Sequence, residues 1–91
     1  MPRITLEVPG LLRDAVDGRA EIELEAEDVA GLLRQLRERW PVLAALVLEG
    51  QELRPHVLLM KGQRCTRWMG EDELSLQDGE RLTIWQAVSG G

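Results

Sequence analysis

Two segments in the first third of the chain alternate between apolar and polar residues, which is the pattern of a half-buried strand. In residues 3–9, RITLEVP, an isoleucine, a leucine and a valine share one side, and in residues 20–26, AEIELEA, an isoleucine and a leucine do so. The Asp17-Gly18 pair between them indicates a turn within a loose loop. We therefore expect the two segments to pair as an antiparallel hairpin, with the three glutamates of the second in solvent.

Residues 27–41, EDVAGLLRQLRERWP, carry a clear helical pattern, because their apolar side chains recur at helical spacing and share one face. Asp28 suits the N-cap, and Arg37 and Arg39 suit the negative end of the helix dipole. Pro41 ends the helix, because it forces the residue before it toward extended geometry. We predict that the buried face consists of Val29, Leu32, Leu33, Leu36 and Trp40.

The chain after this helix alternates short apolar runs with turn signals. Residues 42–48 form either a short second helix or an irregular apolar connector, and Glu49-Gly50 indicates a turn. Residues 57–60 predict a strand that turns back into a second short strand ending at Cys65. A loop-rich stretch over residues 68–80 then leads to the last strand.

The segment RLTIWQAV, residues 81–88, predicts a final strand with Leu82 and Ile84 on one face and Thr83 and Trp85 on the other. A single long helix cannot cover two sheets, so the economical arrangement is one mixed sheet with the helix across one face. The last strand is apolar enough to be central and should run beside the first. This order predicts an α+β fold of the β-grasp layout, with a mixed sheet of four to five strands and one main helix.

Composition narrows the function classes. The formal net charge of −5 argues against a nucleic-acid ligand, because phosphates require a basic face. One cysteine and one histidine leave no disulfide framework and none of the usual zinc sites, so we expect no metal, and Cys65 is interpreted as an ordinary strand residue. The chain shows no long apolar run and no signal-peptide layout, which predicts a cytoplasmic protein without a membrane segment.

The ending DGERLTIWQAVSGG, in this strand order, resembles the ubiquitin-like sulfur-carrier family. That family includes the small subunit of molybdopterin synthase, the thiamine sulfur carrier and carriers that deliver sulfur for cysteine synthesis. The resemblance covers essentially the whole chain, and the early VPGLLRDAVDG also looks like the family's first strand and loop. It departs from the family at Gln86-Ala87, where members often carry prolines. It implies a β-grasp domain over residues 1–87 and a flexible tail over residues 88–91.

The resemblance implies a chemistry for the tail. The Gly91 carboxylate would be adenylated with ATP by an E1-like adenylating and sulfurtransferase enzyme and then converted to a thiocarboxylate. Gly90, Ser89 and Val88 would thread the partner's channel, because glycines leave a narrow passage open. The chain itself would be a carrier and not an enzyme, with no bound cofactor. The acceptor would be the larger molybdopterin synthase subunit or a PLP-dependent cysteine synthase.

Side chains on the face opposite the helix are candidates for partner binding. Trp85, Met60 and Leu58 would form an apolar patch there if that face is open, or would be covered by the connector after the helix. Arg81 either orients an acid of the partner or is simply a surface residue. Trp68 either plugs a loop or contacts a partner, and we expect the loop plug.

Two other functions are compatible with the same residues. The activated Gly91 of a ubiquitin-like modifier would form isopeptide bonds with substrate lysines. An inert β-grasp binding module would use its surface alone, and removal of Gly91 would then change nothing.

Overall fold

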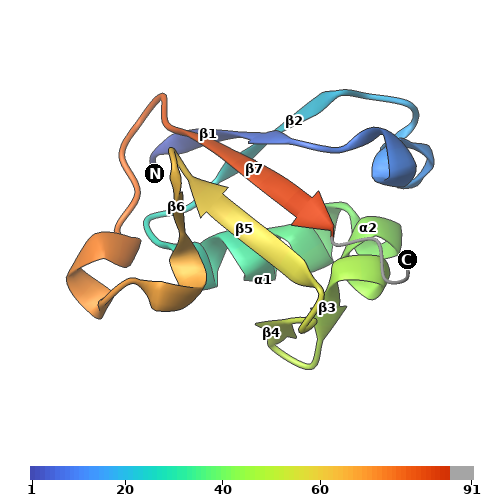
Figure 1. Cartoon of the computed structure of the whole chain (residues 1–91). Coiled ribbons are helices and arrows are strands. Elements are labelled where there is room, and N and C mark those ends of the chain that lie inside the picture. Colours follow the sequence, from blue (N-terminus) through green and yellow to red (C-terminus); the bar gives the residue numbers. More distant parts are fainter. Residues whose placement is uncertain (87–91) are drawn as a thin grey trace.

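Five strands form a mixed sheet in the computed structural model, which describes residues 1–86 (Figure 1). The order across the sheet is β2-β1-β7-β5-β6, with β1 and β7 parallel and the other neighbours antiparallel. This arrangement confirms the predicted hairpin and the predicted place of the last strand beside the first. The strands are β1 Arg3–Glu7, β2 Glu21–Glu25, β5 Val57–Lys61, β6 Arg64–Cys65 and β7 Arg81–Gln86.

One face of the sheet carries the core. In register, Leu6 lies opposite Ile22 on one side and Leu82 on the other, and all three are buried. The pleat sends alternate side chains to the same face, so each strand delivers its apolar set to the side where the helices pack. The largest fully buried side chains include Ile4, Leu6, Ile22, Leu24, Leu32, Leu36, Leu43, Leu59 and Leu82.

The main helix, α1 Val29–Arg39, begins as predicted at an Asp28 N-cap. The carboxylate of Asp28 accepts a hydrogen bond from the Gly31 amide at 2.7 Å, which satisfies one of the unpaired donors of the first turn. A Cβ on Gly31 would lie 3.1 Å from the same carboxylate, so glycine leaves room for the cap. Leu32 and Leu36 are fully buried, whereas Leu33 and Trp40 pack against the core with part of their surface exposed.

The apolar stretch after α1 is a second helix, α2 Pro41–Val47, which resolves the alternative between helix and connector. Pro41 ends α1 and also opens α2, because proline fits the first turn of a helix. α2 packs against α1 and against a 3₁₀ helix, η1 Gly10–Val16, and buries Leu43, Ala44 and Val47.

The loose loop predicted between the first two strands is wrong, because most of it is the helix η1. Its Leu12 and Val16 are buried, and these two anchors order the segment against α2. The predicted Asp17-Gly18 turn is present: both residues have positive φ, 58° and 78°, and carry the chain back into β2.

Short elements complete the fold. A two-stranded hairpin, β3 Leu48–Glu49 and β4 Glu52–Leu53, surrounds the predicted turn at Gly50. Two further 3₁₀ helices, η2 Thr66–Trp68 and η3 Glu71–Leu74, occupy the stretch expected to be loop-rich. The Lys61 ammonium donates to the carbonyls of Glu73 and Ser75, both at 2.8 Å, and so ties this stretch to the end of β5.

The predicted tail, residues 88–91, lies outside the described residues, so the domain boundary at residue 87 stays a prediction. Within residues 1–86 no helix has the length and apolar character required to cross a bilayer.

Candidate functional site

The face of the sheet opposite the helices is open and partly apolar. Leu58 on β5 lies opposite Trp85 on β7, and Met60 lies opposite Thr83, so these side chains share the face that points away from the core. Trp85 is 61% exposed, and Leu58 and Met60 are half-buried. The alternative in which the connector covers them is wrong, because α2 packs on the helix side against α1 and η1. We call Trp85, Leu58 and Met60 the apolar face.

A shallow hollow of about 370 Å³ continues the apolar face toward the edge of the sheet. Trp68 borders it together with Leu58 and Met60 and is 73% exposed, so the expectation that Trp68 plugs a loop is wrong. The neighbouring Arg67 side chain turns the other way: its guanidinium donates to the carbonyls of Pro55 and Val57 at 3.2 and 3.1 Å and so ties η2 to the start of β5. Two exposed tryptophans therefore belong to this side of the molecule.

Cys65 lies at the base of this hollow. It is opposite Met60 in the sheet and only 8% exposed, in agreement with its interpretation as an ordinary strand residue. At the rim, Arg64 holds the Glu73 carboxylate through two hydrogen bonds of 2.9 and 3.0 Å. This bidentate contact lowers the pKa of Glu73 below its ordinary value.

The other half of the open face is acidic. Glu7 of β1 and Glu21 of β2 are directly opposed, and like charges in that position repel each other. The Arg81 guanidinium lies between them, hydrogen-bonded to Glu21 and, at 3.3 Å, to Glu7. The hydrogen bonds to Glu21 and Glu7 raise the pKa of Arg81 above its ordinary value. Arg81 is thus exposed but already engaged with two acids of its own chain.

Gln86 is the last described residue of β7, the strand that leads to the predicted tail. Gln86 lies opposite Val57, and its side-chain oxygen Oε1 is buried and accepts no hydrogen bond from the part of the chain that the structure describes. A groove of about 390 Å³ beside this strand end runs between Thr83 and Trp85 on one side and Arg13 and Glu21 on the other. Because β7 is parallel to β1, both strands end at this groove.

The predicted site residues therefore fall into three groups. Trp85, Met60 and Leu58 are brought together on one face. Arg81 is on the same face and strand as Trp85 but belongs to the acidic half. The tail residues Gly91, Gly90, Ser89 and Val88 lie outside the described residues, and their roles stay predictions.

The structure gives surface roles to residues for which the sequence indicated another role or none. Trp68 extends the apolar face, and Arg34 and Arg37 line a separate hollow on the helix side. The spacing of Arg34 and Arg37 by three residues, which makes them neighbours on the helix surface beside Leu33, was the available signal. Among residues 1–86 no group of three or more histidine, cysteine or acidic side chains is arranged to hold a metal ion.

Comparison with known proteins gives relatives over nearly the whole chain. The chain is 29% identical over 79 residues to small archaeal modifier protein 3 of Haloferax volcanii, covering 84% of this chain and 86% of the relative. No family model matches the chain.

Solved structures are similar over an even larger share. A chain in the crystal structure of the Amycolatopsis orientalis BexX/CysO complex superposes with a TM-score of 0.83 and 25% identity, covering 97% of this chain and 99% of that one. Mycobacterium tuberculosis CysO superposes with a TM-score of 0.79 and 18% identity, over 93% and 99% of the two chains. The predicted β-grasp fold and the resemblance to the ubiquitin-like sulfur-carrier family are confirmed.

Proposed function

We propose that this chain is a sulfur carrier whose Gly91 carboxylate is activated by a partner enzyme and converted to a thiocarboxylate. The observation that carries the proposal is the Ser89-Gly90-Gly91 sequence after the central strand of a β-grasp domain similar to CysO. A carboxylate is a poor electrophile at neutral pH. Attack of its oxygen on the α-phosphate of ATP releases pyrophosphate and gives an acyl-adenylate. A sulfur nucleophile then attacks the acyl carbon and releases AMP.

The chain provides an accessible carboxylate, and its partner enzymes catalyse the reactions. Gly90 and Gly91 lack Cβ atoms, so the reacting carbonyl can be approached from either side within a narrow channel. Ser89 and Val88 join the glycines to the strand and are the residues that the channel would grip. ATP is used by the activating enzyme, and we propose no cofactor bound to this chain.

The apolar face is the surface that we propose for docking the activating enzyme. Trp85 is the last but one described residue of β7 and lies three positions before the tail in sequence, so a partner holding Trp85 would also hold the chain close to the start of the tail. Exposed tryptophans are frequent anchors of protein interfaces. Arg81 acts in this proposal as a positioning residue, because it holds Glu7 and Glu21 in place beside the groove at the strand end.

The acceptor is proposed to be a biosynthetic enzyme of one of two kinds. The larger subunit of molybdopterin synthase would hold the carrier in a stable heterodimer with the tail buried. A PLP-dependent cysteine synthase would bind it transiently and would need a peptidase to trim the product. Size-exclusion chromatography of the carrier with each candidate separates the two, since only the first forms a complex that survives dilution. In both cases the exchange takes place in the cytoplasm.

The test of the carrier proposal is the intact mass of the protein after incubation with an activating enzyme, ATP and a sulfide source. We expect a gain equal to the replacement of one oxygen by sulfur, and no gain in a variant that lacks Gly91. The starting mass checks the premise that Gly91 carries the free carboxylate. An unchanged mass, with an enzyme that is active on another carrier, would contradict the proposal.

A second function is supported by the likeness to a small archaeal modifier protein. In that case the same adenylate, or a thioester derived from it, is attacked by a lysine amine of another protein and forms an isopeptide bond. Incubation with the activating enzyme, ATP and a lysine-rich acceptor protein distinguishes the two. Conjugates of higher mass that disappear when Gly91 is removed support the modifier, whereas a thiocarboxylate alone supports the carrier.

A further inference from the structure

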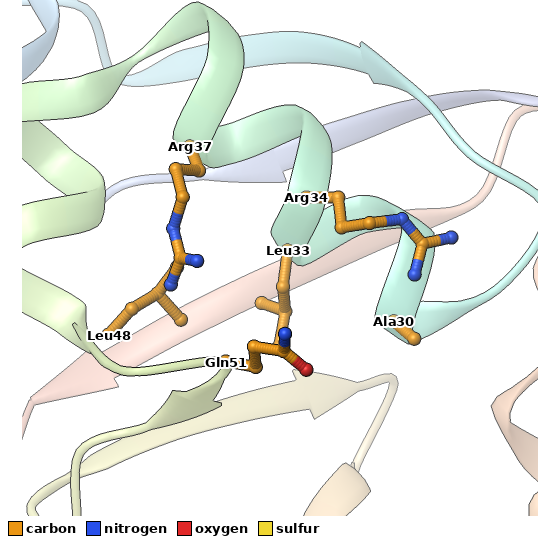
Figure 2. A pocket seen from close by; sticks show the side chains of 6 residues that line it. All are labelled: Ala30, Leu33, Arg34, Arg37, Leu48 and Gln51. Carbon is orange, nitrogen blue, oxygen red and sulfur yellow. The ribbon is translucent and has the colours of Figure 1, made fainter.

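A hollow of about 240 Å³ lies on the helix side of the molecule, between α1 and the β3–β4 hairpin (Figure 2). Its floor is apolar, formed by Leu33 of α1 and the buried Leu48 of β3. Figure 2 shows the Arg37 side chain running from the helix toward Leu48, while Leu33 points toward Gln51 on the hairpin. Arg34 extends from the helix on the side of Ala30 and closes the other end of the hollow.

The basic side chains at this hollow differ from most others on the surface in the contacts that they make. Eight of the eleven basic side chains contact a carboxylate, a carbonyl or an aromatic ring: Arg3, Arg13, Arg19, Arg54, Lys61, Arg64, Arg67 and Arg81. Within residues 1–86 no such contact is found for Arg34, Arg37 or Arg39, and all three belong to α1. Among residues 1–86, the basic side chains that make none of these contacts therefore all lie on one helix, in a chain with a net charge of −5.

The two arginines at the hollow are not equivalent. Arg34 also borders a neighbouring hollow that contains Glu27, Asp28 and Glu38, so part of its field falls on acids of its own chain. Arg37 borders only the apolar-floored hollow among the hollows described here, and the residues lining that hollow include no acid. An incoming carboxylate therefore meets its strongest attraction at Arg37.

We propose that this hollow docks a short acidic segment of a protein partner. The segment would place one apolar side chain over Leu33 and Leu48 and flanking carboxylates against Arg37 and Arg34. A free small molecule fits less well, since small-molecule sites usually enclose about 300–1,000 Å³ and bury most of the ligand. One large side chain fills the available space, and the remaining contacts run along the exposed helix.

The acidic surface elsewhere makes this docking selective. An acidic segment is repelled by the glutamates of the open sheet face and attracted by Arg34 and Arg37, which lie together and make no ion pair within residues 1–86, and this favours one place and one orientation. Because α1 covers the core face of the sheet, a partner at this hollow leaves the apolar face free. The inference does not depend on the chemistry of Gly91, so it stands or falls separately from the proposed function.

The test uses the full chain and a fluorescently labelled peptide with one leucine between glutamates. Two control peptides replace the leucine by serine or the glutamates by lysines. At low ionic strength we expect the glutamate-leucine peptide to bind and to shift backbone amide resonances of residues 30–37 and 48–51. Loss of a hydrogen-bonded charge contact in Arg37→Gln should weaken binding about tenfold. The loss in Arg34→Gln should be smaller, and Arg39→Gln, on the same helix but outside the hollow, should change affinity less than about twofold.

Five results would overturn the proposal. Equal losses in Arg39→Gln and Arg37→Gln would mean that only the general charge of the helix is sensed. Equal affinity for the serine and the leucine peptide would mean that no apolar contact is made with Leu33 and Leu48. Resonance shifts confined to β5 and β7 would mean that the peptide binds away from the hollow. Absence of binding at millimolar peptide would mean that the hollow is not a binding site. Concentration-dependent self-association abolished by Arg37→Gln would assign the hollow to a second copy of the chain instead.

Discussion

The two faces of the same sheet are built from the same strands but are under different demands. On the covered face, Leu82 and Ile84 of β7 are 0% and 2% exposed. In register, Leu82 lies between Leu6 and Lys61, and Ile84 lies opposite Leu59. On the open face of that strand, Arg81 is paired with acids and Trp85 is 61% exposed. Alternation along one strand thus separates residues that hold the fold from residues that are available to a partner.

The open face is itself divided. The β2–β1 side carries opposed glutamates held by Arg81, and the β7–β5–β6 side carries the apolar face with Trp68 at its border. A solvent-exposed apolar patch beside an acidic field is typical of an interface and is not required by packing. Substitutions on the covered face should therefore change stability, and substitutions on the open face should change the binding of a partner.

The largest expected effect comes from removing a core side chain from the central strand. Leu82→Ala should lower the free energy of unfolding by about 3 kcal/mol, because it removes buried apolar surface and leaves a cavity next to Leu6. Urea denaturation followed by circular dichroism measures the change. Trp85→Ala, three residues along the same strand, should cost less than about 1 kcal/mol. Similar costs for the two variants would break the distinction between the faces.

For binding of the activating enzyme we expect the reverse order, with a larger effect in Trp85→Ala than in Leu82→Ala. Trp85→Ala should weaken binding of the activating enzyme at least about tenfold, because a large interface aromatic is lost while the fold is kept. The dependence of the activation rate on carrier concentration measures this, and a raised KM with an unchanged denaturation midpoint is the expected result. Thr83→Ala, on the same face and strand, is the matched control and should have little effect. An unchanged KM in Trp85→Ala would remove the apolar face from the proposed function.

The covered face was largely predictable, because period-2 and helical patterns state which residues must be buried. The five strands of the main sheet, the Asp28 cap and the place of β7 beside β1 follow from those patterns. Several local elements did not follow, and two of them show why. The short run before β3 is almost wholly apolar, so periodicity could not separate helix from connector, and η1 depends on Leu12 and Val16 meeting α2.

The open face was less predictable, because its residues respond to neighbours that are distant in sequence. Arg81 is separated from Glu7 and Glu21 by 74 and 60 positions, and only the β2-β1-β7 order brings the three together. The apolar character of Trp68 favoured burial, yet its side chain is exposed in a segment that the Arg67 guanidinium anchors to the carbonyl of Pro55. The absence of an ion pair at Arg37 within residues 1–86 could not be predicted either, because it depends on which acids the other basic side chains contact.

A smaller effect is expected from the acidic half of the open face. Arg81→Gln should lower the thermal denaturation midpoint slightly, because Glu7 and Glu21 are then opposed without a cation between them. The loss should be greater at low salt, where repulsion between exposed charges is screened least. Adding Glu7→Gln to Arg81→Gln should recover part of the loss. A midpoint independent of salt in Arg81→Gln would show that the two carboxylates do not interact across the strands.

The smallest expected effect concerns the rim of the apolar face and its dependence on pH. The hydrogen bonds from Arg64 lower the pKa of Glu73, so the folded state binds this proton less readily than the unfolded chain. The stabilisation is therefore complete above the ordinary glutamate pKa and is lost as pH falls through the lowered value. Glu73→Gln should lower stability slightly at neutral pH and leave it equal to wild type once the acid is protonated. Because both side chains are exposed, the difference should also shrink in high salt, and a difference that persists in acid would mean that Glu73 stabilises η3 by a contact other than its charge.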